Sequence, residues 1–133
     1  QDSPYAQTQC PDLILSEHST WKRIYLHRMK HSEICIASTG LHQSSGWKIA
    51  EYLAAGRAIV SEPLCYEVPG PFQAGENYLT YTSADGCIEQ IRTLLAHPEQ
   101  ILQMGQRNRA YYDEWLRPDQ IVTKALEQAK ILL

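Results

Sequence analysis

Two short apolar runs, joined by a polar turn and a helix-like segment, constrain this chain more than any other feature of its sequence. Residues 34–37 and 58–60 are continuous apolar runs, which are typical of strands buried on both faces of a parallel sheet. Between them, residues 38–46 are mostly polar and contain two glycines, and residues 47–55 have the pattern of a helix that Gly56 ends. This order predicts a βαβ unit with a right-handed crossover.

Strand and helix patterns continue through the second half of the chain. Residues 78–81 predict a third strand. The spacing of apolar residues predicts helices over 21–31, 85–96, 99–115 and from Pro118 onward. Three strands are few for a doubly wound domain, which usually has about five or six. The sequence therefore predicts an α/β fold: a Rossmann-like three-layer domain with a short parallel sheet, truncated at its N-terminal side.

The first residues differ in composition from the rest of the chain. Residues 1–18 mix Pro, Gln and Ser with one short apolar patch, and we expect them to form an irregular N-terminal segment. The partial domain is then expected to occupy residues 19–133. The chain has no initiator Met, which fits a processed product or a piece of a longer protein.

Charge, cysteines and hydropathy exclude several classes of protein. Twelve Lys and Arg against fifteen Asp and Glu give a net charge of −3, whereas a dedicated nucleic-acid binder needs a basic face for the phosphates. The four cysteines form no C-x-x-C pair, which argues against a zinc ribbon or a redox motif, and we expect no metal. Free thiols, the lack of a secretory signal and the lack of an apolar run of about 20 residues predict a cytoplasmic protein.

The polar turn at 38–47 is the candidate ligand site, because ligands of open parallel sheets bind beyond the carboxyl ends of the strands. Ser44, Ser45 and Gly46 lead into the predicted helix, whose first amides and positive dipole end favour a phosphate group. Gly40 and Gly46 would let a ligand approach the backbone closely. The glycine pattern matches neither the dinucleotide-binding fingerprint nor the P-loop.

Two charged residues follow this turn. Lys48 lies in the first helical turn, where a cation opposes the helix dipole unless an anion is bound nearby. Glu51 lies about one turn further, and its carboxylate could accept hydrogen bonds from the vicinal hydroxyls of a ribose. The alternative interpretation is an ordinary loop between strand and helix, with Lys48 and Glu51 as surface residues.

Two further groups of residues allow a functional and a structural interpretation. Glu62 and Glu67 lie in the loop after the second strand, where paired carboxylates could serve acid–base chemistry or simply face solvent. Tyr111, Tyr112 and Trp115 could stack on a sugar ring, but such a cluster is more often the packing face of a helix.

The central segment resembles the donor-binding half of the GT-B glycosyltransferases, in particular the type called glycosyl transferases group 1. The stretch Lys48-x-x-Glu51-Tyr52-Leu53-Ala54-Ala55-Gly56 is similar to a K-x-x-E-Y-L-A-x-G form found in one branch of that group. A strand near 77–81, a helix at 85–96, His97-Pro98-Glu99 and a helix with Met104-Gly105 are similar to the end of that domain. The resemblance covers roughly residues 19–130.

The resemblance implies a role for each residue that matches the motif. Glu51 would hold the ribose of a nucleotide-sugar donor, and Lys48 would help to neutralise its diphosphate. The first glutamate of the family signature, which approaches the donor sugar, falls on Gln43, so the catalytic position holds an amide that carries no charge. The remaining donor-binding positions, which would offer backbone amides or close approach, are Gly40, Ser44, Ser45 and Gly46.

The resemblance also implies what the whole enzyme does. It would be a hexosyltransferase-type enzyme that moves a sugar from an NDP-sugar to a saccharide or lipid-linked acceptor, as in polysaccharide biosynthesis, peripheral to the inner face of the membrane. The acceptor site of such enzymes lies in an N-terminal domain, so we expect this fragment to be inactive alone. Helices that would pack on the missing domain are then expected to expose apolar surface, through which the fragment could dimerise. The alternative is a non-catalytic Rossmann-like module that binds a phosphorylated ligand or a protein partner.

Overall fold

The computed structural model describes residues 3–131 of the chain, and it divides them into two compact units, one up to His31 and one from Ser32 onward. The first unit consists of the helix α1 (Pro4–Gln9), two single turns, η1 (Pro11–Leu13) and η2 (Glu17–Thr20), and the helix α2 (Lys22–His31). The predicted helix over 21–31 is confirmed apart from its first residue.

The N-terminal segment is more ordered than the expectation of an irregular chain. Pro4 stands at the first position of α1, where its fixed φ favours a helix and its missing N–H is not needed. The Thr8 hydroxyl donates to the Pro4 carbonyl over 2.8 Å, and the Gln7 amide donates to the Ser3 carbonyl. The irregular interpretation of this segment is therefore wrong for residues 4–9, although none of them is buried.

The second unit is built on a parallel sheet. The strands β1 (Ile34–Ala37), β2 (Ala58–Ser61) and β3 (Leu79–Thr80) pair in the order β1-β2-β3, with Ile34 opposite Ala58 and Val60 opposite Leu79. All three strands were expected, and the α/β fold with a short parallel sheet is confirmed. β3 is shorter than predicted, because only Leu79 and Thr80 of the expected residues 78–81 form the strand that pairs with the end of β2.

The two long predicted strands differ in burial. Every residue of β2 is fully buried, as a strand buried on both faces requires. In β1 the side chain of Ile36 stays 49% exposed, so the prediction of burial on both faces is wrong for β1. β1 is an edge strand of this sheet, with β2 on one side only.

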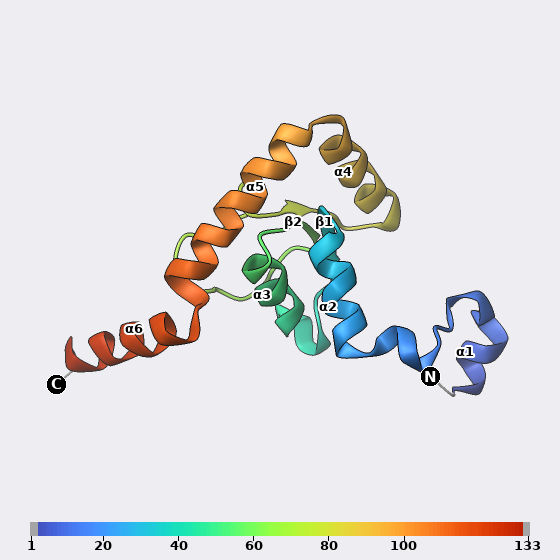
Figure 1. Ribbon diagram of the computed structural model, residues 1–133, viewed down its shortest axis with the longest axis horizontal. Helices are drawn as coiled ribbons and strands as arrows, with labels where there is room; N and C mark the ends of the chain where they lie inside the picture. The colour runs from blue at the N-terminus through green and yellow to red at the C-terminus, as the bar shows by residue number, and fades with distance from the viewer. Residues whose placement is uncertain (1–2, 132–133) are drawn as a thin grey trace. The chain divides into compact units, whose positions relative to one another are not determined.

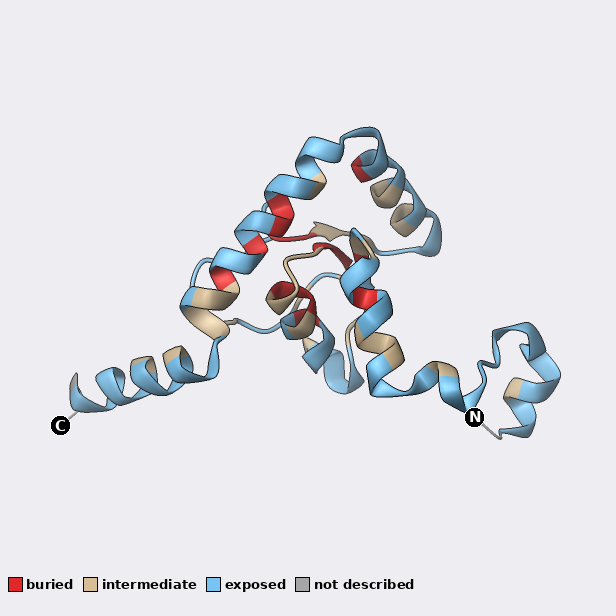
Figure 2. Cartoon of the chain, in the orientation of Figure 1, coloured by how far each residue is buried: buried red, intermediate tan, exposed pale blue. Residues whose placement is uncertain are grey.

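Helices cover the two faces of the sheet. α3 (Gly46–Ala54) connects β1 to β2 and buries Ile49, Tyr52 and Leu53. α4 (Ala84–Ala96) lies on the side opposite α3 in Figure 1, and α5 (Pro98–Tyr111) runs from the end of α4 past the sheet to the end of α3, where Arg109 donates to the Ala54 carbonyl. Their core cluster with β2 contains Ala58, Val60, Leu94 and Met104. Figure 2 shows this buried layer along β2 and on the side of α5 that faces the sheet.

The last helices follow the predicted order with one interruption. Ser83 caps α4, because its hydroxyl oxygen accepts the Gly86 amide over 3.1 Å. α5 ends at Tyr111 and continues as the widened turn η4 (Tyr112–Leu116), so the single helix predicted over 99–115 is two elements. α6 (Pro118–Ile131) begins at the predicted proline and exposes the apolar residues Ile121, Val122 and Leu126. Dimerisation through such a face stays a prediction.

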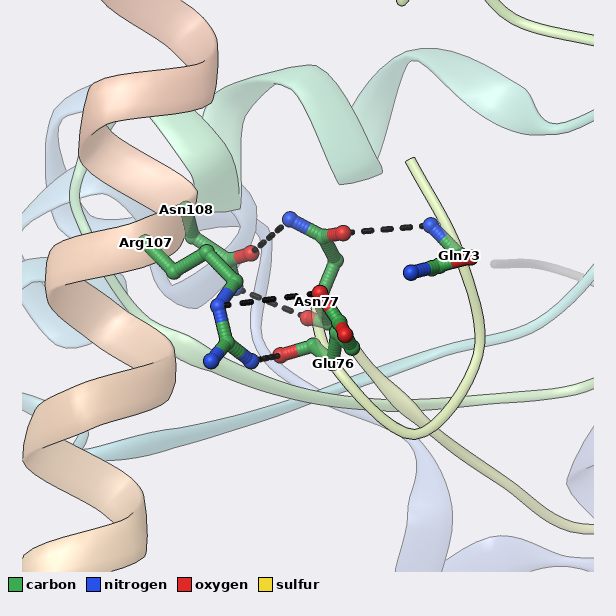
Figure 3. Close-up of polar contacts among 5 residues, drawn as sticks. All are labelled: Gln73, Glu76, Asn77, Arg107 and Asn108. Carbon is green, nitrogen blue, oxygen red and sulfur yellow. Dashed lines mark hydrogen bonds and ion pairs between the residues drawn. The ribbon is translucent and has the colours of Figure 1, made fainter. Parts of the chain in front are cut away.

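Buried asparagines join α5 to the strand and loop beneath it (Figure 3). The Asn108 amide nitrogen donates to the carbonyls of Arg57 and Asn77, at 2.8 and 2.9 Å. The Asn77 amide nitrogen in turn donates to the Asn108 side-chain oxygen over 3.1 Å, and the Gln73 amide donates to the Asn77 side-chain oxygen. The network thus fixes the end of the long loop 62–78 against α5.

Gly105 lets α5 cross the turn between α3 and β2. A Cβ on Gly105 would lie 2.6 Å from the Gly56 carbonyl oxygen, and that oxygen cannot yield without moving the backbone. Gly105→Ala is therefore expected to lower the free energy of unfolding by about 1–3 kcal/mol, although alanine is by itself the better helix former. Urea denaturation measures the change. Gln106→Ala, at an exposed neighbouring position, is the control, and an equally stable Gly105→Ala protein would contradict the close approach.

Candidate functional site

The three parallel strands end at one edge of the sheet, and the segments that leave them are joined by hydrogen bonds. The Thr39 amide and hydroxyl both donate to one carboxylate oxygen of Glu62, Oε2, at 2.6 and 2.7 Å. Tyr81, directly after β3, donates its hydroxyl to the Ala37 carbonyl over 3.0 Å. Its amide donates to the Ser61 carbonyl. These contacts hold the ends of β1, β2 and β3 in fixed positions.

The same contacts set the charge at this edge. The two hydrogen bonds from Thr39 lower the pKa of the Glu62 carboxyl below its ordinary value, because they stabilise the ionised form. Burial raises the pKa of Tyr81, and the nearby Glu62 and Cys87 add to the rise. At neutral pH the carboxyl edge of the sheet therefore carries an ionised glutamate beside a neutral tyrosine.

Acid titration should reveal this ionised glutamate. Because the folded state lowers the pKa of Glu62, its stabilising contribution is present above the unfolded pKa and is lost as the pH falls from about 5 through the folded value. The free energy of unfolding of the wild-type protein should decrease more steeply over this range than that of Glu62→Gln. Urea denaturation at several pH values gives both curves, and parallel curves would rule out the contribution.

The predicted ligand turn closes on itself. The Gly40 amide donates to the Ser44 carbonyl over 2.8 Å, and the Gln43 amide donates to the Gly40 carbonyl over 3.0 Å. A Cβ on Gly40 would lie 2.6 Å from the Ser44 hydroxyl oxygen, so a side chain at this position would require that hydroxyl to rotate away. These bonds join Gly40, Gln43 and Ser44 within one turn, and their role in donor binding stays a prediction.

The backbone of this turn is strained at two neighbouring residues. His42 and Gln43 have φ of 57° and 61°, in the left-handed region that residues with a side chain rarely adopt. The Tyr66 hydroxyl donates to the His42 carbonyl over 3.1 Å and so ties the turn to the loop after β2. Such strain persists only where the surroundings fix the conformation, and it is common at ligand sites.

The start of α3 has backbone amides that the helix itself does not bond. Ser45 stands at the N-cap, its side chain makes no capping hydrogen bond, and the first amides of any helix lack partners within the helix. Gly46 has a φ of 65°, and no atom lies within 4 Å of where its Cβ would be. Space is therefore open where Gly46 would carry a side chain, and the binding of phosphate by Ser45 and Gly46 stays a prediction.

The two charged residues of α3 differ in exposure. Lys48 is exposed in the first turn, as an anion-binding cation must be. Glu51 is half-buried, and its oxygen Oε2 is closed to solvent. Contact between both carboxylate oxygens of Glu51 and the vicinal hydroxyls of a ribose would require this side chain to turn outward. The ribose role of Glu51 stays a prediction.

Hollows flank the turn on the side of the loop after β2. A cavity of about 130 Å³ adjoins Ser45 and Gly46 and is otherwise lined by apolar side chains, among them Ile49 and Phe72. A wider hollow of about 460 Å³ runs along residues 64–72 to Tyr78. The first is too small for a nucleotide, whereas the second has the volume of a small-ligand site. A hollow of about 690 Å³ beside Arg57 and Gly105 lies at the amino edge of β2, away from the turn.

The aromatic cluster near the end of α5 packs inside the protein. Tyr111 is buried, donates its hydroxyl to the Pro69 carbonyl, and has its ring 5.0 Å from that of Phe72. The ring of Trp115 fills the space where Gly70 would carry a side chain. The structural interpretation of Tyr111 and Trp115 is therefore confirmed, and the cluster shapes the loop that borders the wider hollow.

Sequence reasoning missed the bond between Thr39 and Glu62. Both residues come just after strands that pair in parallel, and this shared position was the available signal. Glu67 is exposed in the loop, whereas Glu62 accepts hydrogen bonds from Thr39. The two glutamates considered together in the sequence therefore have different surroundings. Within residues 3–131, no three His, Cys, Asp or Glu side chains are placed to hold a metal ion. No helix in that range is both long and apolar enough to cross a membrane.

Comparison with known proteins assigns the chain to a family. The model of a family described as glycosyl transferase-like matches residues 12–127, which is most of the 133 residues. The chain therefore belongs to the glycosyl transferase-like family, and a general role in glycosyl transfer follows. No curated protein and no solved structure matches the chain.

Proposed function

We propose that this chain is the nucleotide-sugar-binding part of a GT-B glycosyltransferase, from the C-terminal half of the enzyme. The observation that carries the proposal is the closed turn from Gly40 to Ser44, which leads from the end of β1 directly into α3. In a chain of the glycosyl transferase-like family, a turn of this kind at the carboxyl edge of a parallel sheet is where a donor would bind.

Each residue of the proposed donor site has one task. The amides at Ser45 and Gly46 bind the diphosphate, and the exposed ammonium of Lys48 compensates its charge. The amide predicted for this role at Ser44 instead donates to the Leu41 carbonyl over 3.3 Å, so Ser44 can contribute only its hydroxyl. Glu51 turns its side chain outward and accepts hydrogen bonds from the ribose hydroxyl groups. The amides and the Lys48 ammonium favour cleavage of the sugar–phosphate bond, because they stabilise the negative charge that the leaving diphosphate gains.

Gln43 stands at the catalytic position and contacts the sugar by hydrogen bonds from its amide. It cannot act as a base or offset positive charge on the sugar, so positioning provides most of its effect. The acceptor, a saccharide or a lipid-linked saccharide, is bound by a second domain. The chain by itself is then expected to bind donor without transferring the sugar.

Calorimetric titration tests the donor site directly. The chain should bind one of UDP, GDP and ADP saturably, and it should bind the matching nucleoside far more weakly, because the diphosphate provides most of the contacts. Lys48→Gln should weaken binding of that diphosphate by about tenfold, through the loss of one charged contact. Lys130→Gln, a change of the same kind on the exposed side of α6, should leave the affinity unchanged. Absence of binding to all three diphosphates would contradict the proposal.

A second function is favoured by one residue. Gln43 replaces the carboxylate of the family signature, and this change suits a module that binds a phosphorylated ligand without turnover. Such a module should bind inorganic pyrophosphate about as tightly as any nucleoside diphosphate, whereas a donor site should prefer one base by about tenfold or more. The same titration distinguishes the two functions.

A further inference from the structure

We propose that Glu62 contacts the hydroxyl groups of the sugar in a bound nucleotide sugar and supplies the negative charge that Gln43 lacks. The inference rests on the proposed function and adds a residue to its site. Glu62 directly follows β2, the middle strand of the sheet, so it lies at the centre of the edge where a ligand is expected.

The position of Glu62 relative to the ligand turn follows from a short chain of contacts. Its Oε2 accepts the Thr39 amide and hydroxyl, at 2.6 and 2.7 Å. Thr39 is the neighbour of Gly40, whose amide and carbonyl close the turn onto Ser44 and Gln43. The residue that contacts the carboxylate is therefore the immediate neighbour of the turn that carries the predicted catalytic position.

Only part of the hydrogen-bonding capacity of this carboxylate is used. An ionised carboxylate has about four acceptor positions on its two oxygens, and Thr39 occupies two of them on Oε2. Within the described part of the chain, no polar group contacts Oε1, and Glu62 is only half-buried. A fixed, ionised oxygen with remaining acceptor capacity is suited to the hydroxyl donors of a sugar.

The charge of Glu62 also decides which part of the donor it would meet. A carboxylate repels a diphosphate, whereas the start of α3 and Lys48 attract it. The diphosphate therefore belongs at α3, and the uncharged, hydroxyl-rich sugar belongs beside Glu62. Glu62 would then place a negative charge near the sugar, beside a turn in which Gln43 offers only an uncharged amide.

Glu62→Gln separates this role from the bond to Thr39. The amide oxygen of glutamine can still accept both hydrogen bonds from Thr39, so the loop contact is kept while the charge is removed. Glu67→Gln is the matched control, because Glu67 is an exposed glutamate of the same loop. Glu62→Asp, which keeps the charge and shortens the side chain by one carbon, is the second variant. It tests the reach of the carboxylate: an aspartate that stays bonded to Thr39 lies one carbon further from the sugar, so Glu62→Asp should also lose most of the advantage of the hexose.

The measurement compares the affinity for a nucleoside diphosphate with that for its hexose derivative. Calorimetry would use the pairs UDP and UDP-glucose, GDP and GDP-mannose, and ADP and ADP-glucose. In the wild-type chain the hexose should tighten binding for one pair. In Glu62→Gln that advantage should fall by about tenfold, while the affinity for the bare diphosphate stays within about twofold. Glu67→Gln should retain both values.

The outcomes distinguish this inference from the proposed function. If the wild-type chain binds none of the diphosphates, the donor site itself is refuted and the role of Glu62 with it. If a diphosphate binds but its hexose derivative binds no more tightly, or if Glu62→Gln and Glu62→Asp keep the full advantage of the hexose, the role of Glu62 is refuted while the donor site stands.

Discussion

Replacing Asn108 with alanine is expected to lower the free energy of unfolding by about 3–4 kcal/mol. Asn108 is fully buried and donates to the carbonyls of Arg57 and Asn77, at 2.8 and 2.9 Å. Its own side-chain oxygen accepts the Asn77 amide over 3.1 Å. The substitution would leave these groups in the interior without partners and would open a cavity beneath α5, and each effect destabilises the fold.

Urea denaturation of the wild-type protein and of Asn108→Ala measures this change. Arg107, the adjacent residue, supplies the control. Arg107 also bonds across to the loop, by donating to the Glu76 carbonyl over 2.9 Å, but its side chain is 48% exposed. Water can replace that contact, so Arg107→Ala should cost about 0.5 kcal/mol or less. A loss for Asn108→Ala no larger than that for Arg107→Ala would show that the asparagine network does not hold α5.

Replacing Glu51 with alanine is expected to weaken binding of the preferred nucleoside diphosphate by about 100-fold or more. In the proposed site this carboxylate accepts hydrogen bonds from the ribose hydroxyl groups. Hydrogen bonds to an ionised group are about twice as strong as those between neutral groups. Alanine also favours a helix, so α3 is retained. Calorimetric titration with the diphosphate that the wild-type chain prefers gives the ratio of affinities.

Two further variants make the Glu51 result specific. Glu51→Gln keeps the size of the side chain and removes its charge, so it should also bind much more weakly if the charge matters. Glu127→Ala removes an exposed glutamate from α6 and should bind as the wild type does. Because one oxygen of Glu51 is closed to solvent, the thermal midpoint of each variant must accompany its affinity. Unchanged affinity in folded Glu51→Ala would refute the ribose assignment.

The parts of the fold that the sequence predicted correctly are those with local causes. Continuous apolar runs predicted β1 and β2. Gly56, with a φ of 61°, ends the α3 segment as expected. The start of α4 also has a local cause, because the Ser83 hydroxyl oxygen accepts the Gly86 amide three residues further on. The exposed face of β1 was not predictable in this way, because it depends on which strands pair rather than on the composition of the run.

The contacts that sequence reasoning did not find are long-range. Thr39 and Glu62 are 23 residues apart, and Asn77 and Asn108 are 31 residues apart. No periodicity joins such pairs, since each depends on the sheet register or on how α5 crosses it. The short helix α1 was missed for a different reason, because its polar composition lacks the apolar stripe that predicts helices.

The candidate site shows the same division. Sequence reasoning predicted that Gly40, Gln43 and Ser44 lie together before a helix, because one short turn contains them all. The left-handed backbone at His42 and Gln43 could not be predicted, since neither residue is glycine and the strain is fixed by contacts such as that of Tyr66 with the His42 carbonyl. The tertiary structure therefore supplies the shape of the site, and the local sequence supplies its chemistry.

Amide chemical shifts in a nucleotide titration test the central claim most directly. The chain, labelled with ¹⁵N, would be titrated with UDP, GDP and ADP while its amide resonances are followed by NMR. The donor-site account predicts saturable shifts for one diphosphate at residues 44–51, with smaller shifts at Thr39 and Glu62. Shifts confined to the hollow beside Arg57 and Gly105, or a well-dispersed spectrum that none of the three diphosphates changes, would contradict a donor site at the start of α3.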